Sequence, residues 1–244
     1  MKTIAIIEAR MTSTRLPGKV LRPILGKPML ELLVERIRRA RRVDGIVIAT
    51  TTNSTDEPIE QLARRLEIGC FRGSEDDVLE RVLRAAHQVQ ADVIVEITGD
   101  CPLIDPDIID ELVAVFQGRR FDYVSNNRQR TYPLGLDTQV FSTRVLEEVA
   151  RLTRDPVDHE HVSLYIYKHP ERFSLHNVPG ALPEKYRDIR LTVDTAEDFA
   201  LISQIYETLY PANPAFTLGD VLALFDRSPE LTEVNRGIQQ KRVR

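Results

Sequence analysis

Cysteine is scarce in this sequence of 244 residues, which contains only Cys70 and Cys101. Two thiols are too few for a disulfide framework, so we expect a protein of the reducing cytoplasm. Long apolar runs are also missing, because no stretch approaches the roughly 18 residues that span a bilayer. The first apolar run, Ile4–Ile7, ends at Glu8 and is too short for a signal peptide. We therefore expect neither secretion nor binding to a membrane.

An excess of positive charge is lacking as well. The chain has 33 Lys and Arg against 37 Asp and Glu, a formal net charge of -4. This balance argues against general nucleic-acid binding. Two common phosphate-binding patterns are also absent, the Walker Gly-x-x-x-x-Gly-Lys-Ser/Thr and the dinucleotide Gly-x-Gly-x-x-Gly. A phosphate ligand would therefore need a local cluster of cations.

Short apolar strands alternate with amphipathic helices, and 42% hydrophobic residues suffice for one core. The predicted strands are Thr3–Ile7, Gly45–Thr50, Ile68–Phe71, Asp92–Ile97, Asp122–Ser125, Thr138–Phe141, Ser174–Val178 and Ile189–Val193. Helical apolar stripes begin at Leu30, Ile59, Leu79, Ile109 and Leu218. Capping-box patterns begin at Ser54, Ser74, Thr195 and Thr217. The alternation predicts an α/β fold with a mostly parallel sheet.

Residues 119–141 interrupt this alternation and indicate an inserted arm or hairpin. We expect a single domain over residues 1–244, with a smaller lobe over about 120–180. The arm carries several large apolar side chains, and exposed apolar surface often marks an interface. These residues are Tyr123, Tyr132, Leu134, Leu136 and Phe141. We therefore expect a two-fold symmetric homodimer, the commonest oligomer class.

The most informative segment is the loop after the first strand, residues 9–19. It gathers the cations Arg10, Arg15 and Lys19, three hydroxyl side chains and a Pro-Gly turn. A loop of this composition at the end of a parallel strand favours a polyphosphate ligand. The alternative is a solvated basic surface loop.

Residues 6–21 of this segment resemble the opening of the sugar-acid cytidylyltransferases, which make the CMP derivatives of 3-deoxy-manno-octulosonate (KDO) and sialic acid. The matching pattern is Ile6-Ile7-x-Ala9-Arg10-x-x-Ser13-x-Arg15-Leu16-Pro17-Gly18-Lys19-x-Leu21. The chain is most similar to the spore-coat and surface-polysaccharide branch. The resemblance implies a three-layer α/β/α, Rossmann-like nucleotide-diphospho-sugar transferase fold. It also implies that Ala9, Arg10, Ser13, Arg15 and Lys19 surround CTP.

Two aspartates follow predicted strands and match metal ligands of the same family. Asp100 lies in Thr98-Gly99-Asp100-Cys101-Pro102-Leu103, and Asp194 lies in Val193-Asp194-Thr195. The resemblance implies that both hold Mg²⁺, a cation that prefers hard oxygen ligands. Otherwise Asp100 is an ordinary turn residue and Asp194 only favours a helix N-terminus. We expect Asp198 to be a capping partner of Thr195.

Three further segments resemble the family's base-binding and sugar-binding regions. Gly73 and Ser74 would border cytosine, although Ser74 also fits a helix N-cap. Tyr132, Gly135, Asp137 and Gln139 would shape the sugar site, but Leu134 stands where Arg is expected and Gln139 where Glu is expected. His161 and Tyr165 would share a helix face and contact the sugar acid, whereas His159 and His161 are too poorly spaced for zinc.

The expected activity is therefore Mg²⁺-dependent transfer of CMP from CTP to a sugar acid, with release of pyrophosphate. Arg15, Lys19, Asp100 and Asp194 would carry the catalysis by positioning and neutralising phosphates. Two other functions stay open. One is transfer of another nucleotide to a sugar or polyol phosphate, and the other is nucleotide binding without catalysis.

Overall fold

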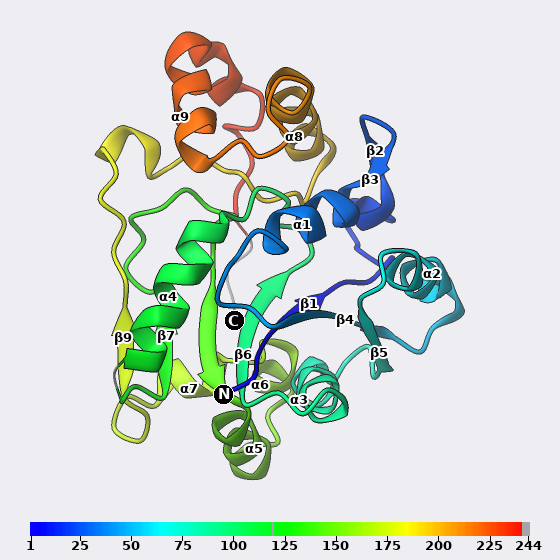
Figure 1. The fold of residues 1–244 in the computed structure, drawn as a ribbon, viewed down its shortest axis with the longest axis vertical. Coiled ribbons are helices and arrows are strands. Elements are labelled where there is room, and N and C mark those ends of the chain that lie inside the picture. The colour runs from blue at the N-terminus through cyan, green and yellow to red at the C-terminus, as the bar shows by residue number, and fades with distance from the viewer. Residues whose placement is uncertain (119, 241–244) are drawn as a thin grey trace.

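The structure is a computed structural model that describes residues 1–118 and 120–240. Seven of the described strands form one sheet in the order β5-β4-β1-β6-β8-β7-β9. Their bounds are β1 Thr3–Glu8, β4 Gly45–Thr51, β5 Gly69–Gly73, β6 Val93–Thr98, β7 Tyr123–Ser125, β8 Gln139–Ser142 and β9 Leu175–Asn177. Only β8 runs against its neighbours. The predicted mostly parallel sheet is confirmed (Figure 1).

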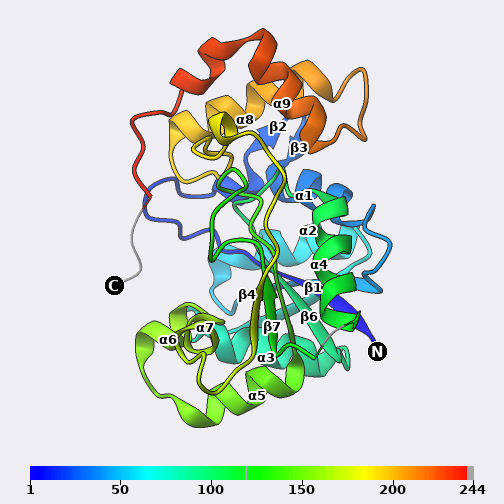
Figure 2. The same cartoon turned by 90° about the vertical axis from the view of Figure 1, so that its left-hand side faces the viewer.

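Helices cover both faces of the sheet and make a three-layer α/β/α fold (Figures 1 and 2). One face packs against α1 (Met29–Ile37), α2 (Glu57–Arg65), α4 (Pro106–Gly118), α8 (Ala196–Leu209) and α9 (Leu218–Arg227). The other packs against α3 (Val78–Gln88), α5 (Thr143–Leu152) and α7 (Leu164–Lys168), with the short α6 (Pro156–Glu160) before α7. A small hairpin joins β2 (Pro23–Ile24) to β3 (Lys27–Pro28).

The central strands are buried on both sides, which explains their continuous apolar runs. Ile4 and Ile6 of β1 pack into one core cluster, while Ala5 and Ile7 pack into the other. Alternation within the strand therefore ties both helical layers to the same sheet. The two acidic exceptions, Glu8 of β1 and Glu96 of β6, lie toward the carboxyl ends of their strands.

Residues 119–141 do not form a separate arm, and residue 119 lies outside the described residues. Strands β7 and β8 pair antiparallel within the main sheet. Tyr123, Leu136 and Phe141 are fully buried, and Tyr132 is nearly so. The prediction that this segment exposes apolar surface was therefore wrong, because these side chains belong to the chain's own core.

Residues 189–193 were predicted as a strand, but they form only an isolated bridge between Leu134 and Arg190. Gly135 makes this close approach possible. Its φ is +101°, and a Cβ there would lie 2.5 Å from the backbone nitrogen of Thr192. The segment therefore lies beside the loop after β7 without joining the sheet as a strand.

The helix starts are confirmed in part. Thr195 and Thr217 form the predicted capping boxes with Asp198 and Asp220. The boxes at Ser54 and Ser74 are wrong, because α2 has no side-chain cap and α3 is capped by Asp77, whose carboxylate accepts from Glu80 N. Within residues 1–118 and 120–240, none of the helices has the length and apolarity that a membrane crossing requires.

Candidate active site

The ends of β1 and β6 lie together at the carboxyl edge of the sheet, where parallel sheets bind ligands. The backbone nitrogen of Gly99 donates to the carbonyl of Glu8 at 2.8 Å. A Cβ at Gly99 would stand only 2.8 Å from that same oxygen, so the turn requires glycine. Beyond it, Val193 N donates to the carbonyl of Asp100 at 2.8 Å. These bonds bring the two predicted metal ligands to one place.

Lys19 bridges the two aspartates. Its Nζ lies 3.1 Å from Asp100 Oδ2 and 3.0 Å from Asp194 Oδ1, and it donates to the carbonyl of Val193 at 2.6 Å. Burial alone would lower the pKa of Lys19, but the charges of Asp100 and Asp194 outweigh it and raise that pKa above its usual range. The ammonium therefore stays charged between two carboxylates.

Asp194 belongs to a wider buried charge network. Besides Lys19 it pairs with Arg15 at 2.9 Å and with Arg190 at 2.7 Å. Burial opposes ionisation, yet the nearby Lys19, Arg15 and Arg190 hold the pKa of Asp194 below its usual value. Asp198 pairs with Arg190 at 2.8 Å, so it does more than cap α8. Asp194 itself is buried, with 6% of its surface exposed.

Two adjoining cavities open above this sheet edge. The first, which we call the loop cavity, has a volume of about 320 Å³ and is lined mainly by residues 8–20, 98–100 and Asp194. The second, the sheet cavity, has about 440 Å³ and lies over the ends of β1, β6 and β8. Four residues line both: Glu8, Thr98, Glu160 and His161. The two cavities are therefore parts of one cleft.

Most of the residues predicted to bind CTP or the metal line the loop cavity. These are Ala9, Arg10, Ser13, Arg15, Lys19, Asp100 and Asp194. Arg10 pairs with Glu75 at 3.0 Å, so part of its charge is already compensated. Gly73 and Ser74 line neither cavity in the part of the chain that is described. Ser74 reaches the cleft indirectly, because its carbonyl accepts from the guanidinium of Arg81, which does line the loop cavity.

The predicted sugar-site residues divide into two groups. Gln139 and His161 line the sheet cavity, and Asp137 pairs with Arg130 of the same wall at 3.0 Å. Tyr132 instead packs against Gly180, Gly135 packs against the 191–192 backbone, and Tyr165 packs against His169 and Phe173.

His161 and Tyr165 do not share one helix, as predicted, because α6 ends at Glu160 and α7 begins at Leu164. A single turn between the two short helices separates the two residues.

Several cleft residues were not identified from the sequence. Glu8 and Glu96 come from the neighbouring strands β1 and β6, and both line the sheet cavity. Burial raises the pKa of Glu8 to about 7 and raises the pKa of Glu96 well above its usual range. Arg128, Glu160 and Tyr167 complete the wall of the sheet cavity. A signal existed for Glu96, a charged residue inside the apolar run 93–97.

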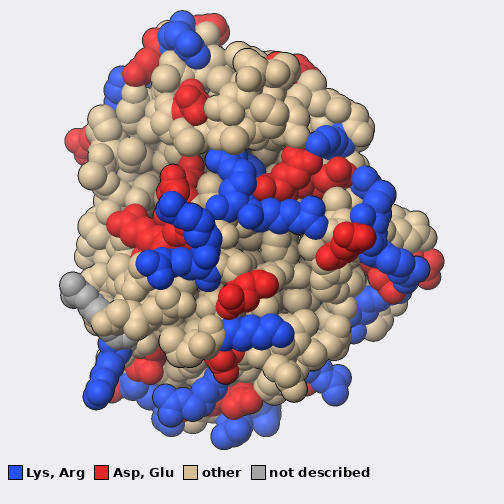
Figure 3. All heavy atoms as spheres, viewed as in Figure 1, with Lys and Arg blue, Asp and Glu red and all other residues tan. Residues whose placement is uncertain are grey.

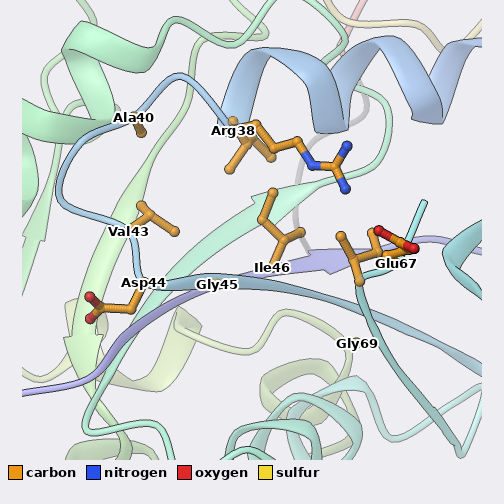
Figure 4. A pocket seen from close by; sticks show the side chains of 10 residues that line it. Arg38, Ala40, Val43, Asp44, Gly45, Ile46, Glu67 and Gly69 are labelled. Atoms are coloured by element: carbon orange, nitrogen blue, oxygen red, sulfur yellow. The ribbon is translucent and has the colours of Figure 1, made fainter.

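Another hollow of about 400 Å³ lies at the opposite edge of the sheet (Figure 4). Gly45 and Gly69, which begin β4 and β5, line it together with Arg38, Asp44 and Glu67. It faces the amino ends of the parallel strands, away from the charge cluster around Lys19. The face in Figure 3 carries interspersed acidic and basic side chains. Because the charge cluster around Lys19 lies at the carboxyl ends of the parallel strands, we place the candidate active site in the cleft over those ends.

Comparisons with known proteins identify the family of this chain. The cytidylyltransferase family model matches residues 4–217. The spore coat polysaccharide biosynthesis protein SpsF of Bacillus subtilis is 35% identical over 234 residues, which cover 92% of this chain and 94% of that protein. A cytidylyltransferase structure from Leptospira borgpetersenii covers 99% of both chains, with 31% identity and a TM-score of 0.90.

A structure of CMP:2-keto-3-deoxy-manno-octonic acid synthetase complexed with CTP shares the fold. Its TM-score is 0.65 at 19% identity, and the match covers 85% of this chain and 99% of that one. The family resemblance predicted from residues 6–21 is thus confirmed along most of the sequence. The chain belongs to the cytidylyltransferase family.

Proposed function

We propose that this protein transfers CMP from CTP to a sugar acid, with release of pyrophosphate, in the biosynthesis of a surface polysaccharide. The observation that carries the proposal is Lys19 held between Asp100 and Asp194 at the floor of the loop cavity. One cation and two carboxylates in a cleft lined by further cations suit a triphosphate and its divalent ion. The CTP named for the related synthetase structure supports the choice of nucleotide.

The triphosphate would lie along residues 10–19. Arg15 and Lys19 offer charged donors from the wall of the loop cavity, and Ser13 offers a hydroxyl. Because phosphoryl transfer asks little covalent chemistry of the protein, catalysis would consist of positioning and charge neutralisation. The positive groups are held in place by buried ion pairs before substrate arrives.

Asp100 and Asp194 fit a magnesium ion only together with the nucleotide. Among the described residues no group of three or more His, Cys, Asp or Glu side chains could hold a metal. Two carboxylates completed by phosphate oxygens and water are a common Mg²⁺ environment. When bound, the ion would neutralise phosphate charge and acidify an attacking hydroxyl.

The sugar acid would occupy the sheet cavity. Arg128 lines it, is exposed, and pairs with no carboxylate in the described part of the chain, so it is available for the carboxylate of an acceptor. Gln139 accepts from Ser163 at 2.8 Å and would present its amide to hydroxyl groups. The amide replaces the expected Glu without losing hydrogen bonding.

The direct test is a matrix of nucleoside triphosphates and sugar acids, with pyrophosphate release as the readout. We expect release only with CTP, Mg²⁺ and a sugar acid, and a CMP-linked product by mass spectrometry. Release with a sugar phosphate and another nucleotide would instead identify the alternative transferase. Nucleotide binding without release under any combination would contradict catalysis.

The Lys19→Ala variant should weaken CTP binding about ten- to a hundredfold, because a charge-assisted contact contributes about 1.5–3 kcal/mol. Cytidine, which lacks phosphates, should bind the variant and the parent equally. Calorimetry with both ligands measures the difference. Equal losses for CTP and cytidine would place the triphosphate elsewhere.

We also propose a two-fold symmetric homodimer. The interface cannot be the apolar side chains of residues 123–141, since most of them are buried within the chain. Light scattering at micromolar concentration should give twice the mass of one chain. A single-chain mass would refute the dimer.

A further inference from the structure

The proposed transfer leaves one pair of buried acids without a role. Glu96 is 5% exposed and lies beneath the sheet cavity, yet it forms no ion pair with any described residue. Glu8 Oε1 and Glu96 Oε2 are both buried without a donor among the described residues. Two adjacent carboxyl groups in such a place are stable only if they share a proton.

Glu8 stands where the loop cavity meets the sheet cavity. It lines both, as do Thr98, Glu160 and His161. Glu8 is a half-buried residue that borders the cleft, whereas Glu96 is buried beneath it. With CTP over the loop and an acceptor in the sheet cavity, the reacting hydroxyl must cross this junction.

We propose that Glu8 is the general base that takes the proton of the attacking hydroxyl, and that Glu96 is a positioning residue that holds Glu8. This inference rests on the proposed function. The acceptor O–H bond breaks and its proton passes to the Glu8 carboxylate. The acceptor oxygen bonds to the α-phosphorus as the bond to the β-phosphate oxygen breaks, and pyrophosphate leaves with that electron pair.

The surroundings of Glu8 suit this role. Burial is the largest influence on the pKa of Glu8 and raises it. The charge of Arg81 from α3 and the hydrogen bond from Glu96 of β6 lower that pKa, whereas the charge of Asp100 raises it. The result, a pKa of about 7, is close to optimal for a base at neutral pH. Glu160 and His161, at the end of α6, face the same junction from the opposite wall.

Neither of those two residues is as well placed. Glu160 is exposed at the end of a five-residue helix. His161 caps that helix, and no hydrogen bond to a described residue fixes its ring. Glu8 instead projects from a central strand whose register with β6 places it opposite Thr98.

The test uses CTP labelled at the α-phosphate, with the accepted sugar acid and, separately, with water alone as the attacking hydroxyl. A general base contributes about 10²–10⁴-fold, so Glu8→Gln should lower kcat/KM by at least the smaller factor. Its affinity for CTP should be unchanged. In the parent, kcat/KM should fall as the pH drops below about 7, and this acidic limb should vanish in Glu8→Gln.

The Glu96→Gln variant tests whether Glu96 positions Glu8. Its amide replaces the protonated carboxyl group of Glu96 as the donor to Glu8 and is the weaker donor, so the pKa of Glu8 should rise and the acidic limb should move to higher pH. Glu57→Gln, at the exposed start of α2, is the matched control and should behave as the parent. Circular dichroism checks that each variant folds.

An acidic limb that persists in Glu8→Gln would assign the base to another group and overturn the proposal. A Glu8→Gln rate within about tenfold of the parent would do the same. Failure of every sugar acid with the parent enzyme would instead refute the proposed acceptor class. The water reaction still tests Glu8 in that case, because it needs no acceptor.

Discussion

Asp100→Asn should lower pyrophosphate release by about 10²–10³-fold, the usual cost of removing one preorganised charged group from a transition state. Asp100 contacts Lys19 at 3.1 Å and Thr98 at 2.6 Å, and its side chain is 25% exposed. The substitution keeps the size of the side chain, so the fold should survive. Release at saturating CTP, measured across Mg²⁺ concentrations, gives both the loss and any weakened metal dependence.

Asp107→Asn is the matched control for this variant. Asp107 is an exposed aspartate on α4 whose side chain lies 3.5 Å from Arg41. It should retain parental turnover at every Mg²⁺ concentration. If Asp100→Asn did so too at limiting Mg²⁺, Asp100 would not be a metal ligand.

Asp194→Asn should damage stability as well as turnover. Its carboxylate is shared by Lys19, Arg15 and Arg190, and breaking a buried pair costs about 3–5 kcal/mol. We expect the lower end, because Lys19 keeps Asp100 and Arg190 keeps Asp198. Urea unfolding should show a lower midpoint with an unchanged slope.

The pH dependence of stability provides a separate check on Asp194. Its pKa is lowered by folding from 3.8, so ionised Asp194 stabilises the folded state above pH 3.8. This contribution is lost as the pH falls through the lower folded pKa. The parent and Asp194→Asn should therefore converge in stability at acid pH. A constant difference between them down to that range would contradict the ion-pair account.

The sequence predicted the parallel part of the sheet because its strands are buried on both faces. Runs such as Thr3–Ile7 and Asp92–Ile97 differ from their observed strands by one residue at most at either end. Residues 189–193 have the same apolar character, yet they are not a strand. They are buried by the loop at Leu134 and Gly135, and burial without a partner strand produces the same sequence pattern.

The candidate site was predictable where charge gathers in one loop and hidden where it depends on distant contacts. Lys19 and Asp194 were identified separately, but no local pattern could show that they are 3.0 Å apart. The acid pair was missed for a different reason. A glutamate at a strand end, such as Glu8, normally faces water, and only the placement of Glu96 beside it makes both unusual.

The contact between Leu134 and Arg190 limits how acceptor choice could be engineered. Leu134 N donates to the carbonyl of Ile189 at 3.0 Å, and Leu191 N donates to the carbonyl of Leu134 at 2.7 Å. The segment that contains Leu134 continues to Gln139 in the sheet cavity, and the segment that contains Arg190 continues to Asp194 in the loop cavity. A chimaera that imports the loop over 126–138 from a relative must therefore import residues 189–193 with it. The two segments form one module for transplantation, although fifty residues of sequence separate them.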